Sequence, residues 1–84
     1  MNIFSWNVNG LRAVEKKGKL AEFLAEKDPD IVCFQEIKID ESQLIKEDFA
    51  KKYRGFYQFF SHAERKGYAG TAIWTKTQPN AILR

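Results

Sequence analysis

The stretch "IVCFQE", residues 31–36, determines how the rest of the chain is interpreted. Four apolar residues stand in a row and are followed by Gln35 and Glu36. An unbroken apolar run of this length is typical of a strand covered on both faces, whereas a strand with one face in water alternates apolar and polar residues. We therefore expect a central strand that ends in a carboxylate.

On the amino-terminal side of this strand, the pattern predicts a strand and then a helix. Residues 2–8 are bulky and suited to a strand, and the Asn-Gly pair at 9–10 is a turn signal. Residues 12–27 have apolar side chains at roughly helical spacing, with Gly18 expected to interrupt or bend the segment and Pro29 to end it. A helix between two strands of one sheet usually makes a right-handed crossover, so we expect the two strands to be parallel.

On the carboxyl-terminal side, the sequence predicts a second helix followed by two strands that form a hairpin. The helix is expected at 40–52, with Asp40 or Ser42 as its N-cap. A strand rich in aromatic residues is expected at 54–60, a charged loop at 61–68 and a further strand at 69–75.

The composition is that of a small globular domain or of part of a larger one. The 84 residues are 44% hydrophobic and 14% aromatic, which excludes a disordered chain. The net charge of +3 permits binding to nucleic acid without establishing it. No apolar run is long enough to span a membrane, and the first residues do not have the pattern of a signal peptide. The only cysteine, Cys33, lies in the apolar run, so we expect a reduced, buried thiol and a cytoplasmic protein.

Two polar side chains are expected to meet where the parallel strands end. Asn7 lies at the end of the first strand and Glu36 at the end of the second. Parallel neighbours place their carboxyl ends at one edge of the sheet, where the ligands of open α/β sheets bind. A carboxylate after an apolar run is costly unless it is hydrated or paired with a cation, and Mg²⁺ or Mn²⁺ suits such oxygen ligands. The amide of Asn7 can hold a phosphate oxygen or a metal-bound water without adding negative charge.

Simpler interpretations of the same residues remain open. Glu36 is also consistent with a solvated side chain or an ion pair to Lys38, and an Asn-Gly pair after a strand is commonly only a turn. In the charged loop, Arg65 and Lys66 are suited to phosphate contacts and Tyr68 to packing on a sugar or base. The loop is equally consistent with an ordinary hairpin connection whose charges confer solubility.

Three blocks of the sequence resemble one known family. They are "SWNVNGLR" at 5–12, "DPDIVCFQEIK" at 28–38 and "GYAGTAIWTK" at 67–76. In this order and spacing they are similar to the amino-terminal blocks of the exonuclease III class of apurinic/apyrimidinic (AP) endonucleases, within the endonuclease/exonuclease/phosphatase superfamily. The resemblance covers nearly the whole chain, and the Gly-Tyr-Ala-Gly sequence points to the DNA-repair branch.

The resemblance implies an α/β fold of the DNase I-like kind, a four-layer sandwich in which two β-sheets pack face to face with helices outside. This chain would supply one sheet with its outer helices. The implied reaction is Mg²⁺-dependent hydrolysis of a phosphodiester 5′ to an abasic site in duplex DNA, with Mn²⁺ as a possible substitute for Mg²⁺. Removal of nucleotides in the 3′-to-5′ direction is also implied.

The resemblance also implies a role for individual residues. Glu36 would bind the metal, Asn7 would be an active-site amide and a weaker ligand, and Asn9 would contact the metal through water. Lys38 and Arg12 would support the site. Tyr68 would contact the DNA backbone, and Gly67 and Gly70 would shape its loop.

The chain is short for this family, whose members have on the order of 250 residues. We therefore expect residues 1–84 to be the amino-terminal part of one domain, with the general base and the remaining metal ligands outside it. One carboxylate and two amides do not make a hydrolytic site, so this piece alone is expected to be inactive. It is also expected to self-associate through an uncovered sheet face. Two other functions remain open, namely a phosphodiesterase or phosphatase acting on non-DNA phosphates and a non-catalytic binding module.

Overall fold

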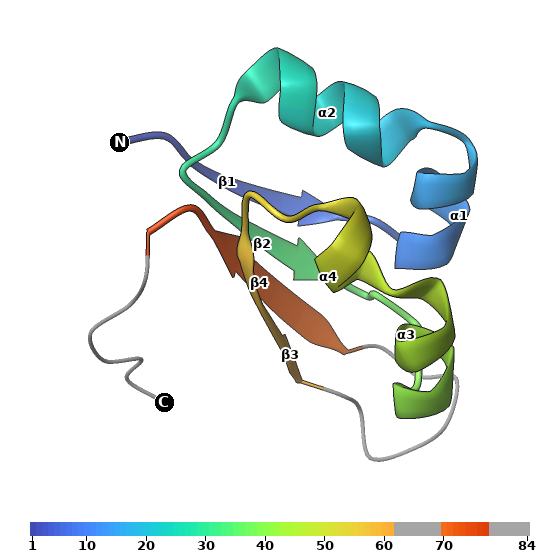
Figure 1. Cartoon of the computed structure of the whole chain (residues 1–84). Coiled ribbons are helices and arrows are strands. Elements are labelled where there is room, and N and C mark those ends of the chain that lie inside the picture. Colours follow the sequence, from blue (N-terminus) through green and yellow to red (C-terminus); the bar gives the residue numbers. More distant parts are fainter. Residues whose placement is uncertain (62–69, 78–84) are drawn as a thin grey trace.

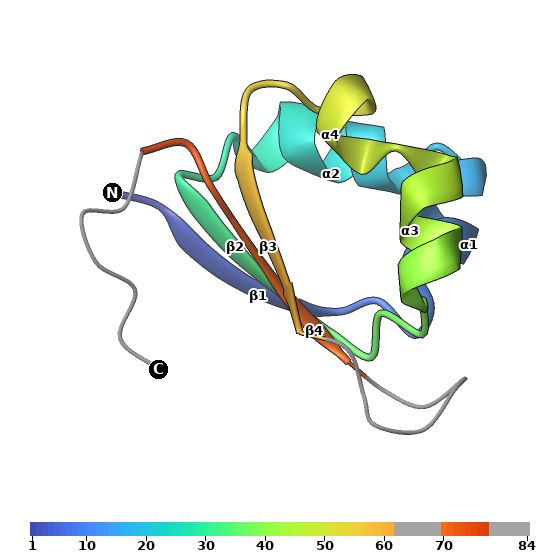
Figure 2. The same ribbon diagram turned by 60° about the horizontal axis from the view of Figure 1, so that its bottom comes forward.

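The computed structural model describes residues 1–61 and 70–77 of the chain. These residues form one mixed four-stranded sheet with the strand order β1-β2-β4-β3. The helices lie on one face of this sheet, so the described residues build two layers (Figure 1, Figure 2). The α/β architecture that the sequence predicts is confirmed.

The first two strands are parallel neighbours, as the crossover argument predicts. β1 (Ile3–Asn7) and β2 (Ile31–Gln35) pair in register from their first residues to their last. Both strands therefore end at the same edge of the sheet, which is the edge on which the prediction of a site depends.

The two later strands form the expected antiparallel pair. β4 (Thr71–Thr75) pairs with β3 (Tyr57–Ser61) on one side and with β2 on the other, and it is antiparallel to both. β3 begins later than the expected 54–60 because residues 53–55 form a turn after the last helix. The charged loop expected at 61–68 lies outside the described residues, except for Ser61.

The first helical segment is divided at the glycine that the sequence singles out. α1 (Leu11–Lys16) and α2 (Lys19–Lys27) are separated at Gly18, which has a φ of 76°. This left-handed conformation is readily adopted only by a residue without a side chain. Asp28 ends α2 with a φ of 44°, immediately before Pro29. The predicted break and the predicted end of the helix are both confirmed.

The single helix expected at 40–52 is wrong, because the structure has two short helices there. α3 (Glu41–Glu47) and α4 (Phe49–Lys52) are separated by Asp48, which has a φ of 52°. The Asp48 side chain accepts a hydrogen bond from the backbone N–H of Lys51 at 3.4 Å. Asp48 therefore ends one helix and caps the next.

The start of α3 settles which residue is its N-cap. The Asp40 carboxylate accepts a hydrogen bond from the backbone N–H of Gln43 at 2.8 Å. The Gln43 side chain accepts one in return from the backbone N–H of Asp40 at 3.0 Å. This reciprocal pair is a capping box, so Asp40 and not Ser42 is the N-cap.

The core lies between the sheet and the helices. Val32, Phe34 and Trp74 point from the central strands toward the helices and are fully buried. Leu20 and Phe49 cover them from the helical side and are also buried. The Trp74 ring lies 5.0 to 6.3 Å, between ring centroids, from the rings of Phe34, Phe49, Tyr53, Phe56 and Phe60.

The opposite face of the sheet is not covered by any described element (Figure 2). By alternation and register, its apolar residues are Ile3, Ile31, Cys33, Tyr57, Phe59 and Ile73, and these define the open face. Ile3 is 63% exposed and Ile73 is 41% exposed. The expected burial of Cys33 is wrong for the described residues, because this thiol is only half-buried on the open face. The sequence predicts that both faces of β2 are covered, and the described residues cover the face toward the helices but not the opposite one.

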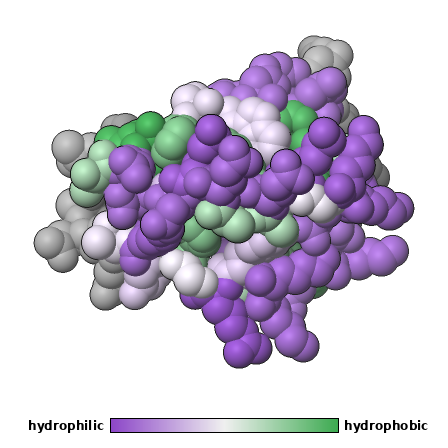
Figure 3. All heavy atoms as spheres, turned by 90° about the horizontal axis from the view of Figure 1, so that it is seen from above, coloured by the Kyte–Doolittle hydropathy of each residue, from purple (hydrophilic) through white to green (hydrophobic). Residues whose placement is uncertain are grey.

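The outer surface of the helical layer is mainly hydrophilic, with smaller apolar areas, when viewed from above α2 (Figure 3). This is the normal pattern for helices that bury one side against a sheet and expose the other. Among the described helices, none has the length and apolar character needed to span a membrane.

Candidate active site

The structure brings together the two residues that the crossover argument predicts to meet. Asn7 is the last residue of β1, and Glu36 directly follows β2. The side-chain nitrogen Nδ2 of Asn7 donates a hydrogen bond to Oε2 of Glu36. The backbone pairing continues beyond the strands, since the N–H of Val8 donates to the carbonyl of Gln35 at 3.1 Å. The predicted placement at one edge of the sheet is therefore confirmed.

The turn after β1 fixes the orientation of the Asn7 amide. The backbone N–H of Asn9 donates to Oδ1 of Asn7 at 3.2 Å, so the oxygen faces the turn and the nitrogen faces Glu36. Asn9 and Gly10 have φ values of 47° and 106°, and the second value requires glycine. The N–H of Gly10 then donates to the carbonyl of Glu36 at 2.8 Å.

Lys38 joins the same group of side chains through Asn9. Its Nζ donates a hydrogen bond to Oδ1 of Asn9. Within the described part of the chain, the ion pairs do not include one between Glu36 and Lys38, so the simple ion-pair interpretation of Glu36 is not supported. The site thus consists of one carboxylate, two amides and one ammonium group. These belong to Glu36, Asn7, Asn9 and Lys38, and we call them the Asn7–Glu36 row.

This row can bind a cation or an anion but is chemically incomplete. A carboxylate attracts a metal ion, and amide and ammonium groups can donate to phosphate oxygens. No group of three or more His, Cys, Asp or Glu side chains suited to a metal ion occurs in residues 1–61 and 70–77. These residues also provide no histidine, since the only one in the chain is at position 62.

The remaining predicted site residues are placed only in part. Arg65, Lys66, Gly67 and Tyr68 lie outside the described residues, so their predicted contacts with DNA stay predictions. Gly70 is described, and its carbonyl accepts a hydrogen bond from the N–H of Ile37 at 3.1 Å, directly beside Glu36. Arg12 is exposed on α1, one residue after Leu11, whose N–H donates to the carbonyl of Ile37 at 2.9 Å.

Comparison with known proteins identifies the family. Residues 4–83 match the Endonuclease/Exonuclease/phosphatase family. The chain belongs to this family.

Relatives within the family carry the names of DNA nucleases. An exodeoxyribonuclease of Bacillus subtilis (strain 168) is 41% identical over 85 residues, covering 99% of this chain and 31% of the relative. A DNA-(apurinic or apyrimidinic site) endonuclease of Dictyostelium discoideum is 42% identical over 82 residues, covering 98% of this chain and 22% of the relative. The chain therefore spans less than a third of the length of these relatives.

Solved structures of DNA-processing enzymes have a fold similar to that of this chain. The 3′ phosphatase NExo from Neisseria, bound to a product DNA hairpin, matches with a TM-score of 0.75 and 31% identity over 95% of this chain and 29% of that one. An AP endonuclease from Archaeoglobus fulgidus matches with a TM-score of 0.72 and 32% identity over 94% of this chain and 29% of that one. The predicted resemblance and fold class are confirmed.

One feature of this family member was not predicted from the sequence. Glu36 and Lys38 have φ values of 53° and 50°, the left-handed region that residues with a side chain rarely adopt. Nothing in the residue types at 36 and 38 signals this conformation. An asparagine or glycine there would have been the usual indication.

A second contact missed at the sequence level joins α1 to the turn after α4. The hydroxyl of Tyr53 donates a hydrogen bond to Glu15, whose carboxylate also lies 3.6 Å from Nζ of Lys52. Burial, and then the hydrogen bond and charge of Glu15, raise the pKa of the Tyr53 hydroxyl well above its usual range. This contact anchors α1, and it lies outside the Asn7–Glu36 row.

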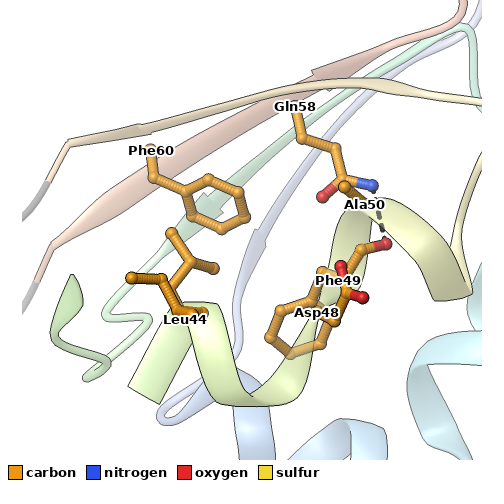
Figure 4. Close-up of a pocket in the computed structure, with 7 residues that line it drawn as sticks. Leu44, Asp48, Phe49, Ala50, Gln58 and Phe60 are labelled. Carbon is orange, nitrogen blue, oxygen red and sulfur yellow. Dashed lines mark hydrogen bonds between the residues drawn. The ribbon is translucent and has the colours of Figure 1, made fainter. Parts of the chain in front are cut away.

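A hollow of about 440 Å³ lies between α3, α4 and β3, away from the Asn7–Glu36 row (Figure 4). Among the described residues that line it, only Asp48 is charged, and the side-chain nitrogen of Gln58 donates a hydrogen bond to the carbonyl of Phe49 at 3.0 Å. The other described lining residues are Leu44, Ile45, Phe49, Ala50, Gln58 and Phe60. The Asp48 carboxylate caps α4, and the described lining includes no cationic side chain that could bind a phosphate, whereas Lys38 lies beside Glu36, Asn7 and Asn9 at the sheet edge. The sheet edge is therefore the better candidate for the active site.

Proposed function

We propose that this chain forms the amino-terminal part of a DNA-repair nuclease. In this proposal the complete protein hydrolyses phosphodiesters of duplex DNA 5′ to abasic sites and removes nucleotides in the 3′-to-5′ direction. The observation that carries the proposal is the contact between Asn7 and Glu36 at the carboxyl edge of two parallel strands, in a chain of this family. The names of the bacterial and amoebal relatives support DNA as the substrate.

The donor atoms at this edge fit a hard divalent cation. Glu36 offers a half-buried carboxylate, and the amides of Asn7 and Asn9 are neutral neighbours. Carboxylate oxygens are preferred by Mg²⁺ and Mn²⁺, and Mg²⁺ commonly keeps several of its waters. We propose that Glu36 binds the cation, that Asn7 is a weaker ligand, and that Asn9 acts through water. The cation would offset negative charge that develops on the phosphate oxygens during hydrolysis.

The groups of the chain itself are suited to receiving a phosphodiester. Asn7 holds Glu36 in place through its N–H while adding no negative charge that would repel the substrate. Lys38 holds Asn9 and brings a positive charge to the same row. The exposed guanidinium of Arg12 adds a second positive charge on α1, and both charges favour the approach of an anionic strand.

The proposed partner is duplex DNA, which would also contact the segment before β4. Tyr68 is proposed to meet the DNA backbone between Gly67 and Gly70, with Arg65 and Lys66 on phosphates. Two findings support this assignment. The Neisseria relative is bound to a DNA hairpin, and Gly70 is hydrogen-bonded to the residue after Glu36.

The general base and further metal ligands are proposed to come from a part of the protein beyond this chain. The single carboxylate of the row supports this view, as does the length of the relatives. Residues 1–84 would then be one part of a single larger domain and would be inactive when isolated.

The proposal is tested by cleavage of a duplex oligonucleotide that contains a stable abasic analogue. In the complete protein with Mg²⁺, Glu36→Gln should lower turnover by about three orders of magnitude or more, because it removes the charged ligand at the row. Glu26→Gln on the exposed part of α2 is the matched control and should leave turnover unchanged.

Three outcomes would contradict the proposal. Turnover of the folded Glu36→Gln protein close to that of the wild type would exclude the ligand role. Hydrolysis of small phosphate esters without cleavage of DNA would favour the non-DNA phosphatase. DNA binding that is unaffected by Glu36→Gln, with no cleavage by the wild type, would favour a non-catalytic binding module.

A further inference from the structure

The regular alternation of β2 is inverted at Glu36. In β2, Val32 and Phe34 face the helices, so alternation would also direct residue 36 toward them. Glu36 is instead half-exposed, and the next residue, Ile37, is 0% exposed. Glu36 has a left-handed φ of 53°, which breaks the extended strand conformation. From this residue on, the side chains exchange faces, so that Glu36 points outward and Ile37 points into the core. Without this conformation, the carboxylate would point into the core rather than toward Asn7.

This conformation must be held by its surroundings. A left-handed residue that carries a side chain is disfavoured sterically, and such residues persist only where the neighbouring structure enforces them. At Glu36 the enforcement comes from the residue that follows it. Ile37 buries its whole side chain in the core cluster, which it can do only if Glu36 is turned outward.

The main chain of Ile37 is fixed on both sides. Its N–H donates to the carbonyl of Gly70 at 3.1 Å, and its carbonyl accepts from the N–H of Leu11 at 2.9 Å. The preceding carbonyl, that of Glu36, accepts from the N–H of Gly10 at 2.8 Å. Ile37 therefore ties together the turn after β1, the end of β2 and the residue before β4.

We propose that Ile37 is a positioning residue for the candidate metal site. It does not touch the metal or the substrate. Its buried, branched side chain and its two main-chain hydrogen bonds hold Glu36 in the left-handed conformation that directs the carboxylate to Asn7. This inference rests on the proposed function of Glu36 as a cation ligand and deepens it.

Ile39 provides a matched control for this role. It is also a buried isoleucine, at 6% exposed, and it also follows a left-handed residue, Lys38. The difference that matters here is that the left-handed residue before Ile39 is Lys38 and not the Glu36 carboxylate. Replacing either isoleucine by alanine should destabilise the core, but only Ile37→Ala should disturb Glu36.

The test measures binding of Mn²⁺ to the complete protein, by the enhancement of water proton relaxation, at a temperature where each variant is folded. Ile37→Ala should weaken Mn²⁺ binding by about tenfold or more, the usual scale for residues that orient a metal ligand. Ile39→Ala should change it by less than about twofold. Amide hydrogen exchange at Gly10 and Leu11 should accelerate in Ile37→Ala and not in Ile39→Ala.

The outcomes separate this inference from the proposed function. If Glu36→Gln binds Mn²⁺ as tightly as the wild type, the cation site itself is wrong. If Glu36→Gln loses binding but Ile37→Ala and Ile39→Ala behave alike, only the positioning role is wrong. Should Ile37→Ala not fold, Ile37→Val and Ile39→Val give the same comparison with the loss of one methylene group. A weaker Mn²⁺ affinity in Ile37→Val alone would then support the inference, and equal affinities would overturn it.

Discussion

Replacing Asn7 by aspartate tests the arrangement of the candidate site. In the structure the Nδ2 of Asn7 donates a hydrogen bond to Glu36. Aspartate keeps the shape of the side chain, but it has no N–H to donate and carries a negative charge next to the Glu36 carboxylate. The variant protein should therefore be less stable than the wild type when no divalent cation is present.

The size of the effect follows from two terms. Two unit charges about 4 Å apart repel by about 1 kcal/mol in water and by about 4 kcal/mol at the effective dielectric typical of a protein surface. Asn7 is exposed and Glu36 is half-buried, so the repulsion should lie toward the lower value. Loss of the hydrogen bond adds about 0.5–1.5 kcal/mol. We expect the free energy of unfolding to fall by about 1.5–3 kcal/mol near neutral pH.

The same substitution two residues later should have the opposite sign. Asn9 accepts its hydrogen bond from Nζ of Lys38, so Asn9→Asp places a new carboxylate beside a cation. Exposed ion pairs contribute up to about 1 kcal/mol, and Asn9→Asp should leave stability unchanged or raise it by that amount. The two variants carry the same change in charge, so a difference between them reports on their neighbours alone.

Urea unfolding of the complete protein, in a buffer with a chelator and again with Mg²⁺, provides the measurement. Added Mg²⁺ should stabilise Asn7→Asp more than the wild type, because two adjacent carboxylates bind a hard cation more strongly than one. Equal destabilisation by the two substitutions, or a stable Asn7→Asp protein without Mg²⁺, would refute the arrangement of charges described here.

Three further predictions concern other parts of the chain. In the complete protein, Tyr68→Ala should weaken binding to abasic duplex DNA by about 1–2 kcal/mol at fixed salt. An unchanged dissociation constant would show that the loop does not contact DNA through Tyr68 and would favour an ordinary hairpin connection. Because the pKa of Tyr53 is raised in the folded state, the unfolded chain releases its proton first as the pH rises. Stability should therefore fall above the ordinary tyrosine pKa of about 10, and Tyr53→Phe should flatten this dependence in urea titrations. The isolated 84-residue chain should lack abasic-site cleavage and should sediment as a dimer or larger species. Ile73→Lys on the open face should shift the isolated chain toward the monomer. Ile45→Lys on α3 is the control, since this residue is 74% exposed and lies away from the open face, and it should not change the oligomeric state. A monomeric wild-type chain would contradict the prediction.

Much of the scaffold of the site could be predicted because its signals are local. The apolar run that ends at Phe34, the Asn-Gly turn and Pro29 each restrict the backbone over a few residues. Together they determine a parallel pair of strands, and this pair is enough to bring Asn7 and Glu36 to one edge. The placement of the site therefore follows from handedness and strand direction rather than from detailed packing.

The parts that could not be predicted depend on contacts between distant segments. The left-handed conformations of Glu36 and Lys38 have no signal in the residue types at these positions. At Glu36 the conformation is imposed by burial of Ile37 and by hydrogen bonds from Gly10 and to Gly70, which lie far away in the sequence. Local preference disfavours the result, and tertiary structure overrides it.

The open face of the sheet indicates where the missing groups of the candidate site, the general base and the remaining metal ligands, would come from. Ile31, Cys33 and Ile73 follow the pattern of strands covered on both sides, yet the described residues cover only the helical side. An apolar sheet face of this kind is normally buried by another layer. By alternation Asn7 lies on the same face as these residues, at its carboxyl edge, with Glu36 beside it. A layer that buries Ile31, Cys33 and Ile73 would therefore end next to the Asn7–Glu36 row, and we expect the general base and the remaining metal ligands to come from that layer.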